Sequence, residues 1–464
     1  MECVDFATSP KRRDGSSQTP LAHHEICTRA FHAKETFFAV FWPSNKRAVV
    51  SGFWSGPGAG ISSRFAAANL THIHQLYETD IPSHESMSAR PAFEGPSHDL
   101  VRGNILQALM RTPLDPVSNS RVTMEDIYFF QTGMAAIYKT HSYLAKTLEG
   151  TTVLFGMAFM DTVKVLQEYG RNFKFFGMGH DGELEDLAKF LEEERTMGRK
   201  VQSIWTEIPA NPLLVTPDVR KLRLLADEYE TLLIIDDTVG SWANIDVMGF
   251  ADMIVTSLTK SFNGYADVIA GSIILNPLSR ANHEIRGIFE ANYIPELYVQ
   301  DAQTIARNSQ DYLARTQKLN HNARTLAEYL ESCTQSPGSA VSRVYYPTIN
   351  SSGSYYRQLM RPATEHFKPG FGCLFAVEFE DLAATEAFYD NLNVHKGPHL
   401  GAPFTLAFAY TMCAYKSKLD WASKYGLRPT QLRISAGLED TATLLQDFKV
   451  AVVAANRVNG NVGP

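Results

Sequence analysis

Two apolar runs decide how this chain folds: Leu232-Leu233-Ile234-Ile235-Asp236 and Met253-Ile254-Val255-Thr256-Ser257-Leu258-Thr259-Lys260. Each begins with continuous apolar side chains, which is typical of a strand buried on both faces of a parallel sheet. Each ends in polar side chains. Because open α/β sheets bind ligands beyond the carboxyl ends of their strands, we expect these polar groups to meet in one site.

The polar groups match the chemistry of pyridoxal phosphate (PLP). A lysine amine such as that of Lys260 can form a Schiff base with the cofactor aldehyde, and a buried acid such as Asp236 can pair with the pyridinium nitrogen. The hydroxyls of Ser257 and Thr259 suit a phosphate. Taken singly, Asp236 could be a helix cap and Lys260 a surface lysine. Their order and common position at strand ends predict a PLP site.

Strands and helices alternate beyond residue 125, which predicts an α/β domain with a mostly parallel sheet between helices. Strands are expected at 125–130, 151–155, 201–205 and 232–235, and helices at 183–194 and 219–228. A long helix at 311–331 then leads to strands near 343–346 and 373–379 and helices near 383–392 and 441–455. That last part predicts a smaller α+β domain.

We therefore expect three parts: an N-terminal tail and arm over 1–71, a PLP-binding domain over 72–312 and a C-terminal α+β domain over 313–464. Residues 1–20 are polar and basic, which predicts disorder. No strand precedes the glycine run 56–60, so we expect it to shape the arm and not to bind a dinucleotide.

Composition narrows the class of protein. The net charge of −7 and pI near 6.1 argue against a role on nucleic acid or an anionic membrane. The five cysteines are scattered and never form a C-x-x-C pair, which argues against a disulfide framework or a zinc site, and no metal is expected. The chain shows neither a secretory signal nor an apolar run long enough to span a bilayer, so the cytosol is the expected location.

Two further motifs belong to the same expected sheet edge. Gln131-Thr132-Gly133-Met134 joins a strand to a helix, where backbone amides and the helix dipole can hold a phosphate. Glu207-Ile208-Pro209-Ala210-Asn211-Pro212 follows a strand and brings the Asn211 amide to the carboxyl edge. Either motif alone is weak, since such turns are common.

With these motifs the chain resembles the Cys/Met-metabolism family of PLP enzymes, the cystathionine γ-synthase-like group of fold type I. The resemblance spans about residues 50–455 and rests on motifs at 132–137, 207–212, 236–238, 257–260 and 433–440. It implies a large PLP domain with helices on both faces of the sheet, a smaller C-terminal domain and an N-terminal arm. It also implies a homodimer or homotetramer.

The resemblance assigns roles to individual residues. Lys260 forms the Schiff base and moves protons, and Arg433 binds the substrate α-carboxylate, with His399 on the substrate side. Arg64 reaches the phosphate of a neighbouring subunit. The cofactor-binding residues implied are Gly133, Met134, Phe159, Asn211, Asp236, Thr238, Ser257, Thr259 and Arg64.

Several positions depart from the family pattern. Ser62 stands in place of a tyrosine that contacts phosphate, and Phe159 aligns with a stacking tyrosine, so it can stack without offering a phenol. Asp237 replaces an asparagine, Tyr265 a histidine, and His399 a serine. These changes motivate a specialised reaction.

The predicted reaction is γ-replacement on an activated homoserine ester such as O-acetyl-L-homoserine, through a vinylglycine ketimine. The arm resembles the fungal branch of the family at residues 41–44 and 60–65, some of whose members serve natural-product pathways. We therefore expect a carbon nucleophile such as a β-keto acid (acetoacetate) in specialised metabolism. Cystathionine γ-synthase, O-acetylhomoserine sulfhydrylase, a γ-lyase and a non-catalytic PLP-fold subunit remain the alternatives.

Overall fold

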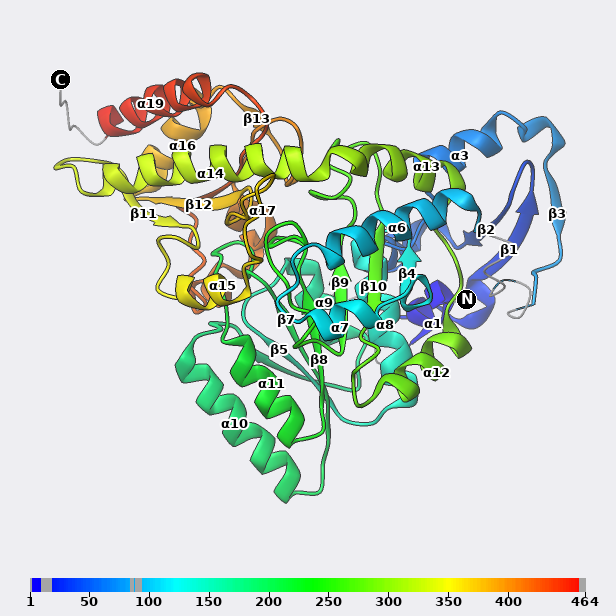
Figure 1. The fold of residues 1–464 in the computed structure, drawn as a ribbon. Helices are drawn as coiled ribbons and strands as arrows, with labels where there is room; N and C mark the ends of the chain where they lie inside the picture. Colours follow the sequence, from blue (N-terminus) through cyan, green and yellow to red (C-terminus); the bar gives the residue numbers. More distant parts are fainter. Residues whose placement is uncertain (1, 10–18, 84–86, 88–93, 459–464) are drawn as a thin grey trace.

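The computed structural model describes residues 2–9, 19–83, 87 and 94–458. Figure 1 shows a central sheet flanked by helices, a C-terminal region above it that begins with the long helix α14 (Tyr312–Thr334), and an N-terminal arm at the side. Within the described part, no helix combines the length and the apolar character that crossing a membrane requires.

The central sheet has seven strands in the order β4-β10-β9-β8-β7-β5-β6. Only β10 runs antiparallel, to both β4 and β9, and the remaining neighbours are parallel. The predicted mostly parallel sheet is therefore confirmed. The strands are β4 (Ile127–Phe130), β5 (Thr151–Phe155), β6 (Asn172–Phe176), β7 (Val201–Glu207), β8 (Leu232–Asp236), β9 (Met253–Thr256) and β10 (Gly271–Leu275).

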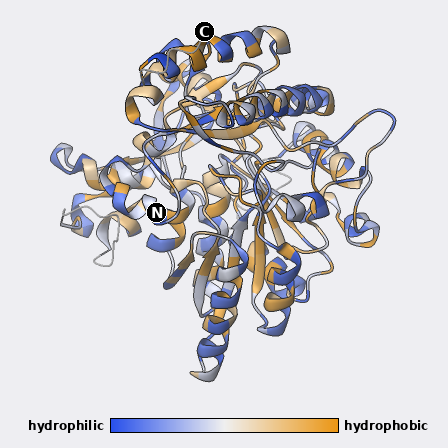
Figure 2. Ribbon diagram, turned by 90° about the vertical axis from the view of Figure 1, so that its left-hand side faces the viewer, coloured by the Kyte–Doolittle hydropathy of each residue, from blue (hydrophilic) through white to orange (hydrophobic). Residues whose placement is uncertain are grey.

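Strand β8 shows why its sequence is continuously apolar. Successive side chains of a strand point to opposite faces, and both faces of this sheet are covered. Leu232 and Ile234 lie in one core cluster with Trp205, whereas Leu233 and Ile235 lie in another. Figure 2 shows the apolar strands between helices with polar outer faces. The main covering helices are α6 (Pro96–Met110), α8 (Gly133–Thr147), α9 (Met160–Glu168), α10 (Asp181–Thr196), α11 (Val219–Glu228), α12 (Asn282–Asn292) and α13 (Val299–Asn308).

The C-terminal region contains the predicted α+β structure. Its five strands have the order β11-β12-β15-β14-β13. They are β11 (Val341–Tyr345), β12 (Leu374–Phe379), β13 (His395–Lys396), β14 (Leu406–Phe408) and β15 (Gln431–Ser435). The helices after α14 are α15 (Gly353–Leu359), α16 (Leu382–Asn391), α17 (Tyr410–Ala414), α18 (Leu419–Ser423) and α19 (Thr441–Val458).

The arm holds two helices and two strands of a three-stranded sheet, whose third strand lies just after the arm in the chain. The strands β1 (Cys27–His32), β2 (Thr36–Phe41) and β3 (Tyr77–Thr79) pair in the order β2-β1-β3. The helices are α2 (Arg47–Ser55) and α3 (Ser63–Leu70).

The prediction of disorder for the first residues is wrong where the structure describes them. Glu2–Thr8 form helix α1, and the ring of Phe6 lies 5.7 Å from that of Phe53 and 5.4 Å from that of Tyr169. Glu2 also pairs with the buried Lys139 at 2.7 Å. Four of the seven residues of this helix are apolar, and the aromatic and ionic contacts order it. Residues 10–18 of the expected tail lie outside the described residues.

Candidate active site

Three parallel strands end side by side at the carboxyl edge of the sheet. In the register of β7, β8 and β9, Glu207 pairs with Asp236 and Asp236 with Val255. The chain after β9 then carries Ser257 and Lys260 to the same edge. Polar groups from separate strand ends are thus brought together, as the two apolar runs predict.

Lys260 is placed beside a residue from the C-terminal domain. Its Nζ lies 3.3 Å from Nδ1 of His399. Burial and the neighbouring charge of Arg433 lower the pKa of Lys260 to about 8. Burial, with the charges of Lys260 and Arg433, lowers the pKa of His399 to about 3, so the imidazole is neutral. A neutral Nδ1 can accept a hydrogen bond from the lysine.

The two consecutive acids at the end of β8 have different surroundings. Asp236 Oδ1 accepts a 2.9 Å hydrogen bond from the backbone of Thr238, and Thr238 Oγ1 accepts one of 2.8 Å from the backbone of Ser257. Asp237 instead accepts a 2.6 Å hydrogen bond from Thr256 Oγ1, and its side chain is buried. Burial raises the pKa of both acids, that of Asp237 to about 8. Asp236 is thus linked to Ser257 through Thr238, whereas Asp237 is bonded to Thr256 at the end of β9.

Arg433 and Asn211 form a polar pair across the two domains. Arg433 Nη1 donates to Asn211 Oδ1 at 3.1 Å, and Nη2 donates to the carbonyl of Pro398. The guanidinium is almost completely buried. Burial and only partial compensation by Tyr410 and Glu207 lower its pKa. A buried cation of this kind gains from an anionic partner such as a carboxylate.

The role of Glu207 was not predicted, although its motif was. Its carboxylate accepts 2.8 Å and 3.1 Å hydrogen bonds from the backbone N–H groups of Phe159 and Asn211. It therefore fixes the turn that carries the predicted stacking ring relative to the Asn211 amide. Tyr410 was missed altogether: its hydroxyl accepts from the backbone of Met160 at 3.2 Å, and its ring lies 4.8 Å from the Arg433 guanidinium carbon. No sequence pattern marked Tyr410.

Helix α8 begins against the loop that carries Lys260. Thr132 caps the helix by accepting a 2.8 Å hydrogen bond from the Ala135 backbone. A side chain at Gly133 would place Cβ only 2.7 Å from Cβ of Ser257. Glycine is thus required for this close approach, and it leaves the first amides of the helix beside the Ser257 hydroxyl. This arrangement fits a phosphate.

Three other predicted residues have contacts of their own. Thr259 Oγ1 donates to the Ala270 carbonyl at 3.1 Å and accepts from the Ala270 N–H at 2.9 Å, so the backbone holds this hydroxyl. Phe159 precedes α9 as its N-terminal cap and is 36% exposed. Arg64 donates to the carbonyl of Asp267 at 2.7 Å and to Asp301 at 3.1 Å within the same chain. Its role toward a neighbouring subunit stays a prediction.

Two of the departures from the family pattern lie in structural contacts. Ser62 caps α3 by accepting a 3.1 Å hydrogen bond from Phe65. Tyr265 donates to Asp311 at 2.6 Å, and its ring lies 5.0 Å from the Arg315 guanidinium carbon. Of the substituted positions, His399 contacts Lys260, and the backbone N–H of Phe159 donates to Glu207.

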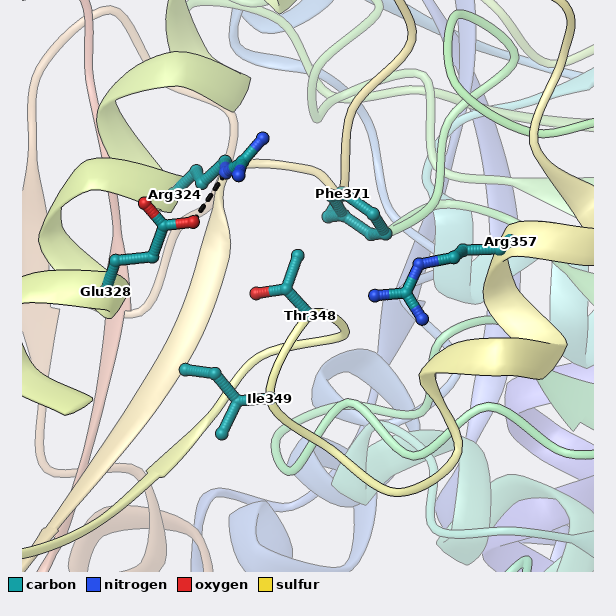
Figure 3. Close-up of a pocket in the computed structure, with 6 residues that line it drawn as sticks. All are labelled: Arg324, Glu328, Thr348, Ile349, Arg357 and Phe371. Carbon is teal, nitrogen blue, oxygen red and sulfur yellow. Dashed lines mark hydrogen bonds and ion pairs between the residues drawn. The ribbon is translucent and has the colours of Figure 1, made fainter.

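A cavity of about 430 Å³ opens elsewhere in the C-terminal domain (Figure 3). It is lined by Arg324, Glu328, Thr348, Ile349, Arg357 and Phe371. Arg324 is paired with Glu328 at 2.6 Å, and none of the predicted site residues lines the cavity. The chemistry is therefore assigned to the sheet edge and not to this hollow.

Comparison with known proteins agrees with the geometry. The family model of Cys/Met metabolism PLP-dependent enzymes matches residues 119–453. An alanine racemase of Aspergillus violaceofuscus is 34% identical over 92% of this chain and 75% of its own length. A cystathionine γ-synthase-like enzyme of Amanita muscaria is 32% identical over 92% and 78%, respectively. The cystathionine γ-synthase of Neurospora crassa is 36% identical over 71% and 52%.

Solved structures share the fold. Cystathionine γ-synthase from Xanthomonas oryzae pv. oryzae, in complex with aminoacrylate and cysteine, superposes with a TM-score of 0.63. The two are 22% identical, and the match covers 78% of this chain and 87% of that one. Together with the lysine, acid and helix N-terminus at one sheet edge, these matches establish that the chain belongs to the Cys/Met-metabolism family of PLP-dependent enzymes.

Proposed function

We propose that this enzyme catalyses γ-replacement on an activated homoserine ester such as O-acetyl-L-homoserine. The observation that carries the proposal is the convergence of three groups: the Lys260 amine with its lowered pKa, the neutral His399 beside it, and the buried Arg433 paired with Asn211. The first two suit proton transfer near an amino acid whose carboxylate the third can bind.

Each residue has a defined task in this reaction. Arg433 binds the α-carboxylate and so fixes Cα and Cβ relative to Lys260. When bound, PLP supplies the electron sink that allows protons to leave these carbons. Lys260 takes the proton from Cα and, once it has released that proton, takes the second proton from Cβ. Acetate then departs from Cγ, the nucleophile adds there, and protons are returned to Cβ and Cα. A pKa near 8 keeps a larger neutral fraction of this amine at neutral pH than an ordinary lysine has.

The nature of the leaving group follows from position 159. Phe159 offers a ring without a phenol, so it cannot donate a proton to the group that departs from Cγ. A carboxylate such as acetate leaves without strong protonation. This supports an acylated homoserine in preference to a donor with a poorer leaving group.

The second substrate is proposed to be a carbon nucleophile such as the β-keto acid acetoacetate, in specialised metabolism. Support comes from His399 beside Lys260 where a serine is expected, and from Phe159 where a tyrosine is expected. The Amanita muscaria relative is named only cystathionine γ-synthase-like, whereas the Neurospora crassa relative is a cystathionine γ-synthase. Ordinary cystathionine or homocysteine synthesis is therefore the main alternative.

The test is incubation of the purified enzyme with O-acetyl-L-homoserine and, separately, acetoacetate, cysteine, sulfide or no nucleophile. Mass spectrometry and NMR of the products identify the new bond at Cγ. We expect a carbon–carbon product from acetoacetate. Product only from cysteine or sulfide refutes the specialised reaction, and acetate release without a nucleophile indicates γ-elimination.

Racemisation is a second candidate, because the alanine racemase relative aligns with 92% of this chain. It needs only exchange of the Cα proton, which Lys260 and a second proton carrier can provide. Incubation with L-alanine in D₂O followed by chiral chromatography separates the two proposals. Appearance of deuterated D-alanine without any reaction of O-acetyl-L-homoserine favours racemisation. If the protein forms no visible cofactor band at all, a non-catalytic role stands instead.

We also propose that the enzyme is a cytosolic homodimer or homotetramer. Trp54 and Ile61 of the arm are 69% and 51% exposed, and they lie close in sequence to Arg64. Burial of such apolar side chains stabilises subunit contacts. Light scattering measures the assembly. Mixing R64A with K260A subunits tests whether Arg64 serves a neighbouring site, because only a shared site yields active hybrids.

A further inference from the structure

The glycine run of the arm lies against the start of helix α8. Thr132 Oγ1 donates to the carbonyl of Gly58 at 3.1 Å, and the backbone N–H of Gly60 donates to Gln131 Oε1 at 2.9 Å. Gln131 and Thr132 are the two residues that precede Gly133. A segment more than 70 positions earlier in the chain is therefore bonded twice to the turn predicted to hold phosphate.

The contact requires glycine at two positions. Gly58 has φ of +65°, and a Cβ there would lie 2.5 Å from Thr132 Oγ1 and 3.0 Å from Met134 Cβ. A Cβ on Gly60 would lie 2.8 Å from Trp54 Nε1. Any residue with a Cβ disfavours the positive φ of Gly58, and a Cβ at either Gly58 or Gly60 would collide with its neighbours. By contrast, a Cβ on Gly56 would meet only the Gly52 carbonyl, at 3.3 Å.

Thr132 connects this segment to the geometry of the helix. Its hydroxyl donates to Gly58 and accepts from the Ala135 N–H at 2.8 Å, so the Gly58 carbonyl fixes the orientation of the capping oxygen. The cap satisfies one of the free amides of the first turn. The amides of Gly133 and Met134 stay available for an anion, which the positive end of the helix dipole also favours.

We propose that Gly58–Gly60 is a strap that holds the first turn of α8 in the conformation that binds the cofactor phosphate. Its residues act through Gln131 and Thr132, so they are positioning residues and do not themselves contact the cofactor. The strap belongs to the same chain as the turn that it holds. The inference depends on the PLP site and not on which reaction the enzyme catalyses.

The experiment compares G58A, Q131A and T132V with the matched control G56A. Fluorescence titration of each apoprotein gives the affinity for PLP, and exchange against a trapping reagent gives the release rate from the holoenzyme. We expect G58A and T132V to bind PLP about tenfold more weakly, the effect of losing a helix cap. Binding by G56A and T132S is expected to stay within about twofold of that by the natural chain.

Pyridoxal, which lacks the phosphate, separates this role from a merely structural one. If the strap acts on the phosphate-binding turn, G58A and T132V lose affinity for PLP but retain their affinity for pyridoxal. Equal loss for both ligands, or unchanged PLP binding by G58A and T132V, overturns the proposal. Circular dichroism and the apoprotein melting temperature identify a variant that fails to fold, and Q131A, which removes only the Gly60 contact, then provides the test.

Discussion

Lys260 Nζ and His399 Nδ1 lie 3.3 Å apart, although the two residues come from different domains. The loop that carries His399 is fixed on both sides. Arg433 donates to the Pro398 carbonyl, and the Gly401 N–H donates to Ser435 Oγ at 3.1 Å. The imidazole is thus held as an acceptor for the lysine amine. The relationship joins the predicted catalytic base to a predicted substrate-side residue.

Lys260 should react as an unusually acidic lysine. Its pKa near 8 means that, in the apoprotein, acetic anhydride should modify it half-maximally near pH 8, well below the pH at which an ordinary lysine reacts. Peptide mass spectrometry over a pH series measures the modification of Lys260 and, as a comparison in the same sample, that of the exposed Lys189. The K260A variant should lose the visible band of bound PLP and about 10³-fold in activity. Survival of the band in K260A would falsify the assignment of this lysine.

His399 should be replaceable by asparagine but not by leucine. The Oδ1 atom of H399N occupies the place of Nδ1 and can still accept from Lys260, whereas H399L cannot. We expect kcat to fall about 10- to 100-fold in H399L, the usual effect of losing a hydrogen bond to a charged group, and much less in H399N. Steady-state kinetics with matched melting temperatures provide the comparison. Equal losses in both variants contradict a role as acceptor.

Asp237 should make stability depend on pH. Its folded-state pKa of about 8 lies above the unfolded value near 4, so the folded protein holds this proton more tightly. The contribution of Asp237 to the free energy of unfolding is fully present below about pH 4 and is lost as the pH rises through about 8. D237N mimics the protonated acid and can still accept from Thr256. Its melting temperature should therefore fall less between pH 5 and pH 8.5.

The control for Asp237 is D186N, a change at an exposed carboxylate that pairs with Lys189. Surface pairs contribute little to stability, so D186N should keep the pH dependence of the natural chain. Differential scanning calorimetry across the pH series gives the slopes. If the melting temperature of D237N changes with pH as steeply as that of D186N, Asp237 is ruled out as the source of the pH dependence.

Arg433 should bind the substrate through the planar shape of its guanidinium group as well as through its positive charge. R433K keeps a cation but loses the planar fork, which matches a carboxylate and also donates to Asn211 Oδ1. KM for the amino acid should rise about 10- to 100-fold. R428K, at an exposed arginine paired with Glu378, should leave KM unchanged. An unchanged KM in R433K contradicts the assignment of the carboxylate site.

Local sequence patterns predicted five of the seven strands of the central sheet and the polar groups at its edge. The run 232–236 had to be a buried strand because it is apolar at every position, and its last residue had to meet the end of the neighbouring strand. Lys260, Asp236 and Gly133 were predictable for this reason: each follows directly from a local pattern. The edge strand β6 (Asn172–Phe176) and the antiparallel strand β10 (Gly271–Leu275) were not predicted. Strand β6 mixes polar with apolar residues, and of its five residues only Phe176 is buried.

The residues that complete the site from distant parts of the chain are set by the packing of whole elements. His399 reaches Lys260, Tyr410 reaches Met160, and Gly58 reaches Thr132 across domain or arm contacts that no spacing in the chain reports. These contacts depend on how whole elements pack, and the free energy of packing is shared among many side chains. Local periodicity records burial along one element. The meeting of separate elements is a property of the folded chain.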